Sequence, residues 1–152
     1  MKVRDVMNKD VAFVRSDATL ADAARLMWER DCGFTPILEP GTEQVVGVVT
    51  DRDICIATYT QGRAPAAIPV GVAMARRVIS CRDDDDVAAA HAQMRTHQVR
   101  RVPVLDKFGR LVGVVSLNDL ARRAFQESST AARREVAETL AEVCRPRALV
   151  PI

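Results

Sequence analysis

The chain contains an internal repeat, and this duplication restricts the possible folds more than any other feature. Two pairs of matching segments lie 67 residues apart (74 minus 7), and a third pair lies 66 apart (113 minus 47). The first copy therefore has one extra residue near Pro40 and Gly41. Self-similarity at a fixed period is typical of a duplicated structural unit. The matching segments are residues 3–7 with 70–74, 35–38 with 102–105, and 47–54 with 113–120.

Both copies predict the same order of strands and helices. An apolar run suited to a strand comes first, and a helix follows whose N-cap is Thr19 in the first copy and Asp86 in the second. A hairpin and a second helix complete each copy. This β-α-β-β-α order, repeated twice, predicts an α/β (α+β) fold with helices covering one face of each sheet. The expected strands are 11–14, 36–38, 45–50, 78–81, 103–105 and 112–116, and the expected second helices are 51–59 and 117–125.

The two copies are expected to fold together about a pseudo-twofold axis, because units of roughly 50 to 60 residues bury too little surface to be stable alone. A tail without a counterpart in the first copy follows them. There Ser129 or Thr130 would cap a helix that runs to about Cys144 and packs on the module or on a second copy. The predicted boundaries are 1–60 for the first copy, 61–69 for a linker, 70–126 for the second copy, and 127–152 for the C-terminal helix and tail.

Composition argues against several classes of protein. The chain is 48% hydrophobic and 4% aromatic with a formal net charge of +2, whereas nucleic-acid binders usually carry a strong basic excess. No stretch approaches the roughly 18 apolar residues of a membrane span, and the N-terminus lacks the apolar region of a secretory signal. The four cysteines are far apart and form no C-x-x-C pair. These features predict a cytoplasmic protein with reduced thiols.

A short motif at the start of each second helix carries the chemistry. A strand that ends at a helix start leaves backbone N–H groups free at the positive end of the helix dipole, where a phosphate can bind. The hydroxyl of Thr50 or Ser116 can donate a further hydrogen bond there. Three residues on, Asp53 or Asp119 can accept hydrogen bonds from the two hydroxyls of a ribose. In the alternative interpretation, the hydroxyl and the carboxylate only cap the helix.

A glycine opens each of these motifs, at Gly47 and at Gly113. A glycine within a strand often marks a place where another backbone or a ligand approaches closely. The sequence alone leaves both possibilities open.

The doubled pattern resembles a tandem pair of cystathionine-β-synthase (CBS) domains, also called a Bateman module, from about Val3 to Phe125. Two features carry the resemblance: a Gly-apolar-apolar-Ser/Thr-x-x-Asp motif at residues 47–53 and 113–119, and an apolar-Pro-apolar strand in each copy. The resemblance implies a regulatory module that binds an adenosine-containing ligand in the cleft between the repeats. AMP, ADP or ATP is the first expectation, with NAD or S-adenosylmethionine as alternatives.

The resemblance also implies roles for particular residues. Two arginines stand directly before the second apolar-Pro strand and are expected to reach phosphate; in the alternative interpretation, strand geometry points them to opposite faces and only one of them faces the cleft. The first copy has Cys32-Gly33-Phe34 there, so the two sites should be unequal. The implied ligand-binding residues are Asp53 and Asp119 for ribose; Thr50, Ser116, Arg100, Arg101 and Arg52 for phosphate or ribose; and Phe34, Thr35, Pro36, Val102 and Pro103 for the region of the base.

Three other features have simpler explanations than a binding site. The acidic run from Asp83 to Asp86 is expected to cap the following helix rather than to bind Mg²⁺. His91 and His97 are six residues apart (97 minus 91), a poor spacing for a shared metal, so surface or boundary positions are expected. Trp28 is expected to pack at a boundary between copies or subunits rather than to stack on a base. No metal site and no required cofactor are predicted.

The leading hypothesis is a non-catalytic sensor that forms a homodimer. Ligand binding would shift the geometry of the module, and an effector protein would respond in trans. The alternative is a protein-interaction or scaffold module with vestigial ligand clefts and the C-terminal helix as its docking surface. An enzyme is not expected, because the sequence shows no nucleophile–base pair, no metal cluster and no P-loop.

Overall fold

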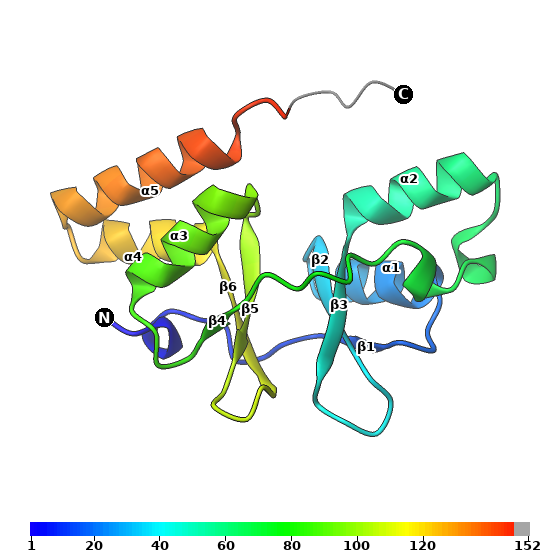
Figure 1. Cartoon of the computed structure of the whole chain (residues 1–152). Coiled ribbons are helices and arrows are strands. Elements are labelled where there is room, and N and C mark those ends of the chain that lie inside the picture. The colour runs from blue at the N-terminus through cyan, green and yellow to red at the C-terminus, as the bar shows by residue number, and fades with distance from the viewer. Residues whose placement is uncertain (148–152) are drawn as a thin grey trace. The chain divides into compact units, whose positions relative to one another are not determined.

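The computed structural model describes residues 1–147 and confirms the β-α-β-β-α order in both repeats, followed by a C-terminal helix (Figure 1). Three-stranded sheets of order β1-β2-β3 and β4-β5-β6 are formed. The elements are β1 (Val14–Arg15), α1 (Leu20–Glu29), β2 (Phe34–Leu38), β3 (Val45–Thr50), α2 (Asp51–Gln61), β4 (Cys81–Arg82), α3 (Val87–His97), β5 (Arg101–Leu105), β6 (Leu111–Ser116), α4 (Leu117–Gln126) and α5 (Thr130–Val143), with short 3₁₀ helices at Val3–Asp5, Pro65–Ala67 and Val70–Val72.

The first strand of each sheet differs from the prediction. The apolar runs at 11–14 and 78–81 were expected to be strands, but only residues 14–15 and 81–82 pair with a neighbouring strand. They run parallel to the middle strand, with Val14 opposite Ile37 and Cys81 opposite Val104. The earlier residues of each run are only partly buried, and Phe13 is 41% exposed, so an apolar run alone did not define the extent of the strand.

The chain forms two compact units, and their boundaries differ from those of the sequence repeats. We call the unit formed by Asp10–Val78 and Asp106–Val112 the first-repeat unit. The second-repeat unit contains Met1–Lys9, Ile79–Leu105 and the chain from Gly113 on. The first residues of each sequence repeat, 1–9 and 70–78, are called its opening segment. Residues 1–9 belong to the second-repeat unit and residues 70–78 belong to the first-repeat unit, so each opening segment lies in the unit that contains the rest of the other repeat.

Backbone hydrogen bonds hold each opening segment in place, and they are equivalent in the two units. In the second-repeat unit, the N–H and C=O groups of Asn8 pair with those of Val114, with N···O distances of 2.9 and 3.0 Å. In the first-repeat unit, Ala75 and Val48 pair in the same way at 2.8 and 3.0 Å. The opening segments therefore extend the hydrogen bonding beyond β6 and β3, respectively.

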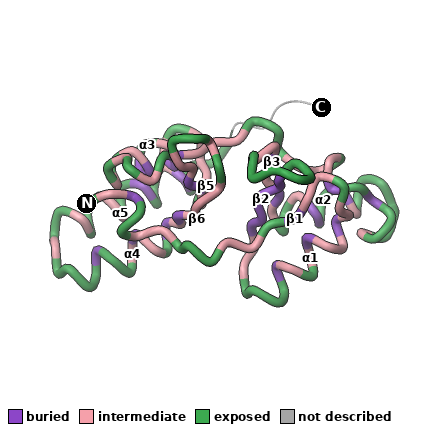
Figure 2. Tube along the Cα trace, turned by 90° about the horizontal axis from the view of Figure 1, so that it is seen from below, coloured by how far each residue is buried: buried purple, intermediate pink, exposed green. Residues whose placement is uncertain are grey.

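Aliphatic side chains form the core of each unit, as expected from the low aromatic content. Buried residues lie along the strands and on the helix sides that face them (Figure 2). The first-repeat core includes Leu20, Ile37, Val49, Ile68 and Val70, each fully buried. The fully buried residues of the second-repeat unit include Val3, Ala90, Met94, Val102, Val104 and Val115.

Helix α5 packs across α3 and α4 in the second-repeat unit (Figure 1). Thr139 and Val143 are its buried residues. Ser129 caps the helix, as predicted, by accepting a hydrogen bond from the Ala132 amide. The corresponding helices of the first repeat, α1 and α2, have no covering helix among the described residues, and they carry two strongly exposed aromatic side chains, Trp28 at 88% and Tyr59 at 86%; Phe125 of α4 is 73% exposed.

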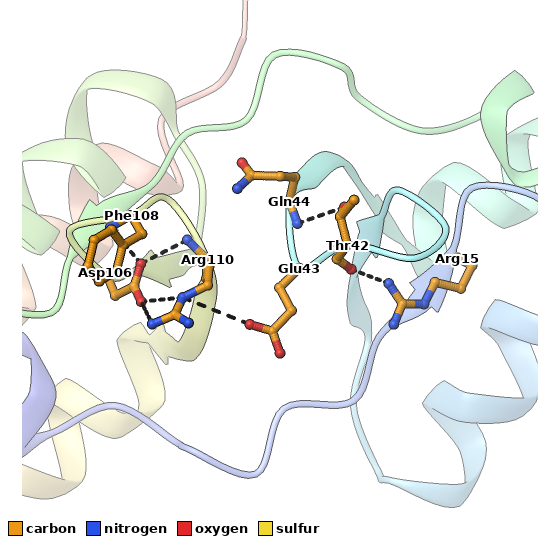
Figure 3. Close-up of polar contacts among 7 residues, drawn as sticks. All are labelled: Arg15, Thr42, Glu43, Gln44, Asp106, Phe108 and Arg110. Carbon is orange, nitrogen blue, oxygen red and sulfur yellow. Dashed lines mark hydrogen bonds and ion pairs between the residues drawn. The ribbon is translucent and has the colours of Figure 1, made fainter.

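The turn between β5 and β6 belongs to the first-repeat unit, where it contacts the turn between β2 and β3 (Figure 3). Arg110 binds Asp106 at 2.7 Å and approaches Glu43 at 4.0 Å. The Leu111 amide donates to the Glu43 carbonyl at 3.2 Å. The turn between β2 and β3 is also held by Arg15, which donates a hydrogen bond to the carbonyl of Thr42 (Figure 3). Polar contacts therefore order both turns.

Candidate functional site

The motif of the first repeat forms the N-terminus of α2. Thr50 is the N-cap residue, and its Oγ1 accepts a hydrogen bond from the Asp53 amide at 3.2 Å. In return, Asp53 Oδ2 accepts from the Thr50 amide at 2.9 Å and from the Thr50 hydroxyl at 2.7 Å. This reciprocal arrangement is a capping box, which satisfies N–H groups that the helix itself leaves unpaired.

The second repeat forms the same capping box at the N-terminus of α4. Ser116 Oγ accepts from the Asp119 amide at 3.1 Å, and Asp119 Oδ2 accepts from the Ser116 amide and hydroxyl at 2.9 and 2.5 Å. The capping interpretation therefore holds for one oxygen of each carboxylate. The second oxygens differ: Asp119 Oδ1 accepts from Arg122 at 2.6 Å. Ile56 stands at the position of Arg122 in the first repeat, and no donor within residues 1–147 binds Asp53 Oδ1.

The loop that precedes the middle strand lies against each helix start. In the first-repeat unit, the Asp51 amide donates to the Gly33 carbonyl at 3.3 Å. In the second-repeat unit, the Leu117 amide donates to the Arg100 carbonyl at 2.9 Å. Each unit therefore brings its predicted loop residues next to the hydroxyl and carboxylate of its motif.

The charge of this loop differs between the units, as the sequence predicted. Arg100 is exposed, and Arg101 is the half-exposed first residue of β5. In the first-repeat unit, the positions equivalent to these arginines hold Gly33 and Phe34. Arg52, the third predicted phosphate ligand, is exposed on the first turn of α2. The loop that contacts the start of α4 thus carries two arginines, whereas the loop that contacts the start of α2 carries none.

The residues predicted for the base region lie on the middle strands β2 and β5 and are largely buried. Phe34 is 9% exposed, and Thr35 and Val102 are fully buried. Pro36 and Pro103 occupy buried mid-strand positions. Thr35 lies opposite Val49, on the same side of the strand as Ile37, and its Oγ1 makes no hydrogen bond to any described residue.

The glycine that opens both motifs has a backbone explanation. A Cβ atom on Gly47 would lie 3.1 Å from the Ala75 carbonyl oxygen and 2.7 Å from Met74 Sδ. A Cβ atom on Gly113 would lie 3.1 Å from the Asn8 carbonyl oxygen and would overlap Met7 Sδ. Of the two possibilities left open by the sequence, close approach of another backbone is the one that the structure shows.

Asp51 and Arg122 are functional candidates that the sequence motifs did not single out. A Cβ atom on Gly33 would lie 2.6 Å from Asp51 Oδ2, so the Asp51 carboxylate occupies space that a side chain at position 33 would need. The equivalent of Asp51 in the second repeat is Leu117. A position-by-position comparison of the two motifs could have identified this charge difference.

The end of α5 is attached to the loop that carries Arg100. Gln98 Nε2 donates to the Arg145 carbonyl at 2.8 Å, and Arg147 donates to the Gln98 carbonyl at 2.9 Å. The Arg100 guanidinium lies 3.5 Å from Cys144 Sγ. These partners are more than 40 residues apart, so no local pattern predicts them.

The acidic run before α3 does not cap that helix as predicted. Asp86 occupies the N-cap position, but its side chain makes no capping hydrogen bond. It binds Lys2 at 2.9 Å instead, and this hydrogen bond lowers the pKa of the Asp86 carboxyl. Arg82 pairs with Asp84 at 3.2 Å. Within residues 1–147, no group of three or more His, Cys, Asp or Glu side chains is arranged to hold a metal ion.

His91 lies in the interface between α3 and α5, rather than at the surface. It is 3% exposed, and its Nδ1 lies 2.8 Å from Thr139 Oγ1. Burial lowers the pKa of His91; nearby Glu135 acts to raise it and Arg95 acts to lower it further. The helical pattern of α3 did not reveal this position because α5, which covers it, has no counterpart in the first repeat.

All four cysteines carry free thiols. Burial raises the pKa of the Cys81 thiol to about 12, so this residue has the character of an inert core residue. None of the helices within residues 1–147 is long and apolar enough to cross a membrane.

Comparison with known proteins identifies the repeat and relates it to ligand-bound structures. The family model of the CBS domain matches residues 3–58 and again 70–125. The CBS domain-containing protein YhcV of Bacillus subtilis is 38% identical over 119 residues, which cover 78% of this chain and 82% of YhcV.

Two solved structures share the fold and contain adenosine derivatives. The CBS domain pair of protein MJ0100 in complex with 5′-methylthioadenosine and S-adenosyl-L-methionine is similar with a TM-score of 0.74 and 25% identity, covering 85% of this chain and 98% of that one. The CBS domain protein PAE2072 from Pyrobaculum aerophilum, complexed with AMP, gives a TM-score of 0.76 and 25% identity, covering 91% of this chain and 99% of that one.

Proposed function

The chain belongs to the CBS domain family and contains the domain twice, and on this premise we propose that it is a regulatory module that binds adenosine-containing ligands. The two ligand-bound relatives support this class of ligand, since one contains AMP and the other contains S-adenosylmethionine and methylthioadenosine. We further propose that the ligand alters an interaction with an effector protein in trans, and that the module acts as a homodimer. Such regulation requires that the ligand bind two states of the module with different affinities.

The observation that carries the proposal is the placement of a carboxylate on the first turn of α2 and of α4, beside the loop before the middle strand. Capping engages only the Oδ2 atoms of Asp53 and Asp119. Asp53 Oδ1 is available to a ribose hydroxyl. Asp119 Oδ1 is bound to Arg122, whose side chain is 76% exposed and can move aside at small cost. Each carboxylate can therefore cap its helix and bind ribose at the same time.

The second-repeat unit has the stronger set of groups for a phosphorylated ligand. Ser116 lies at the positive end of α4, and the Arg100 carbonyl is hydrogen-bonded to the amide at the start of that helix. A guanidinium binds phosphate through charge-assisted hydrogen bonds, which are stronger than neutral ones. We therefore propose that Arg100, Arg101 and Ser116 bind the phosphate of AMP, ADP or ATP.

The first-repeat unit offers a surface for a protein partner. Trp28, Ile56 and Tyr59 are exposed on α1 and α2, and exposed apolar residues that gather on one surface often mark an interaction site. The equivalent helices α3 and α4 are covered by α5. We propose that the α1 and α2 helices contribute to the homodimer or to effector binding.

The proposal is tested by calorimetric titration of the purified protein with AMP, ATP, NAD and S-adenosylmethionine. Asp53→Asn and Asp119→Asn are the informative variants, because an amide oxygen can still accept the capping hydrogen bonds while the charge that ribose would meet is lost. We expect each variant to weaken binding at its own unit by about tenfold or more, the scale of a charge-assisted hydrogen bond.

Exposed Asp84→Asn provides the matched control and should bind every ligand as the wild type does. Absence of heat and of thermal stabilisation with all four ligands at millimolar concentration would favour a scaffold module with vestigial sites. Wild-type affinity in the Asp53→Asn, Asp119→Asn double variant would refute the ribose-binding role.

A further inference from the structure

We infer that the two sites select ligands of different charge. The second-repeat site binds adenosine ligands with a 5′-phosphate, whereas the first-repeat site binds adenosine ligands whose 5′ substituent is uncharged or cationic. This inference rests on the proposed function and specifies the ligand class of each site. It follows from two positions at which the units share a backbone geometry but differ in side-chain charge.

The shared geometry is the hydrogen bond between the loop and the helix start. It joins Asp51 to Gly33 in the first-repeat unit and Leu117 to Arg100 in the second-repeat unit. Because the same backbone groups pair, these four residues occupy equivalent places beside the capping box. At the helix start, the first-repeat unit has a carboxylate and the second-repeat unit has a leucine side chain. In the loop, the first-repeat unit has a glycine and the second-repeat unit has an arginine.

The surrounding charges increase this difference. Around the start of α2, two carboxylates, Asp51 and Asp53, stand against the single guanidinium of Arg52. At the start of α4, the carboxylate of Asp119 binds the guanidinium of Arg122, and the adjoining loop adds two more positive residues, Arg100 and Arg101. The interaction of two charges grows as their distance falls. A 5′-phosphate is therefore repelled by the excess of carboxylates in the first-repeat unit and attracted by the excess of guanidiniums in the second.

Asp51 is positioned to meet the 5′ substituent rather than to serve the helix alone. Its side chain is exposed, and its Oδ1 accepts a hydrogen bond from the Arg52 amide at 2.8 Å. Its Oδ2 lies over Gly33, on the side of the loop. Neighbouring carboxylates favour a positive group, such as a sulfonium or an ammonium, over a phosphate.

Steric contact links the two positions, so they are expected to change together. With Asp51 present, a side chain at position 33 would begin 2.6 Å from Asp51 Oδ2, so the exposed Asp51 carboxylate would have to turn away to make room. In the second-repeat unit, Leu117 stands at the equivalent of Asp51, and position 100 carries a full arginine side chain whose guanidinium lies 3.5 Å from Cys144 Sγ. Gly33→Arg alone should therefore displace the Asp51 carboxylate, whereas Gly33→Arg combined with Asp51→Leu reproduces the second-repeat pair.

The test is calorimetric titration with adenosine, AMP and S-adenosylmethionine. In the wild type, we expect AMP to bind with a stoichiometry of about one per chain and to lose this binding in Asp119→Asn. S-adenosylmethionine and adenosine should bind a site that persists in Asp119→Asn and is lost in Asp53→Asn. Exposed Asp84→Asn is the control for removal of a carboxylate and should leave all three affinities unchanged.

The charge-swapped variant, Gly33→Arg with Asp51→Leu, should gain a second AMP site, with first-repeat affinity for AMP raised by about tenfold or more. Asp51→Asn keeps the size of the side chain and removes only its charge. It should raise the AMP affinity of the first-repeat site by a smaller factor than the charge-swapped variant does. Equal AMP affinities of the two wild-type sites, unaltered in Asp51→Asn, would overturn the inference and leave the proposed function intact. Failure of all three ligands to bind would overturn both.

Discussion

The two repeats share their backbone contacts and differ in what surrounds them. Both units contain a capping box at the second helix, a hydrogen bond from that helix to the loop before the middle strand, and an opening segment paired with the last strand of the sheet. Among the described residues, only the second-repeat unit has a covering helix, α5, and arginines in the loop before its middle strand. Every buried backbone N–H and C=O needs a partner, so these contacts persist in both copies while exposed side chains are free to change.

The difference shows how a duplicated fold can acquire unequal sites without altering its framework. The first-repeat unit has Asp51 and Gly33 at the positions of Leu117 and Arg100. Both units nevertheless keep the hydrogen bond between helix and loop, at 3.3 Å in the first-repeat unit and 2.9 Å in the second-repeat unit. Framework variants should therefore affect both units alike. Variants of the covering helix or of the capping-box surroundings should affect one unit only.

The largest expected effect concerns the motif glycines, where the units should respond alike. Gly47→Ala and Gly113→Ala should each destabilise the protein by about 1–3 kcal/mol, because an added methyl group meets a backbone carbonyl that pairs with the sheet. Urea unfolding measures the change. The control is Gly71→Ala, whose Cβ would lie 3.7 Å from the nearest atom and should cost far less. A large loss for only one of the two glycines would contradict the equivalence of the frameworks.

The next effect concerns the capping boxes. Thr50→Ala and Ser116→Ala each remove one capping hydroxyl and should cost about 1 kcal/mol. Thr96→Ala on the exposed face of α3 is the control and should be nearly neutral. Equal losses for the two capping variants, measured by thermal and urea unfolding, would support equivalent helix starts. If Ser116→Ala matched the control, capping would not explain the retention of the motif in the second repeat.

A pH-dependent effect should distinguish the units, because only the second-repeat unit buries a histidine beneath a covering helix. Burial lowers the folded-state pKa of His91 below its ordinary value of 6.5. Neutral His91 therefore gives its full stabilisation above pH 6.5, and this stabilisation falls as the pH decreases toward the lowered pKa. We expect hydrogen exchange in α5 to accelerate, relative to α1 and α2, as the pH is lowered from 7.5 to 5.5, after correction for intrinsic rates.

His91→Asn isolates this titration, since its amide can still bind Thr139 but carries no charge in this range. The variant should show much weaker pH dependence in α5, whereas His97→Asn should behave as the wild type does. An unchanged pH dependence in His91→Asn would assign the effect to a group other than His91.

The smallest expected effect concerns the ion pair that distinguishes the two ribose-binding candidates. The variant Arg122→Ile introduces isoleucine, the residue that stands at the equivalent position of the first repeat, Ile56. Because Arg122 is 76% exposed, we expect the free energy of unfolding to change by less than about 1 kcal/mol. Chemical unfolding measures this change, and a larger loss would show that the pair with Asp119 is structurally important.

The sequence predicted what depends on local pattern. The apolar pattern within each copy predicted the order of strands and helices. Thr19 and Thr50 cap their helices, which confirms that a hydroxyl residue marks each of these two helix starts. The inequality of the candidate sites was also visible, because Arg100 aligns with Gly33. The assignments of ligand-binding roles to these residues stay predictions.

Contacts between segments distant in the sequence could not be predicted. Asp86 was expected to cap α3, but Lys2, 84 residues earlier (86 minus 2), binds its carboxylate instead. His91 was expected near the surface, but a helix from the unrepeated tail buries it. Both positions depend on a partner that the local sequence does not specify. Trp28 was expected at a boundary between copies or subunits; it is 88% exposed within its unit, and its place at a boundary stays a prediction.

The opening segments also determine where the protein can be divided. A fragment cut at residue 69 would contain the body of the first repeat but lack Ala75, which pairs with Val48 of β3. That strand would then present unpaired N–H and C=O groups at the edge of its sheet, a template for aggregation or for reciprocal strand exchange between molecules. The opening segments thus protect two sheet edges, and a soluble single-repeat fragment would have to extend at least to residue 78.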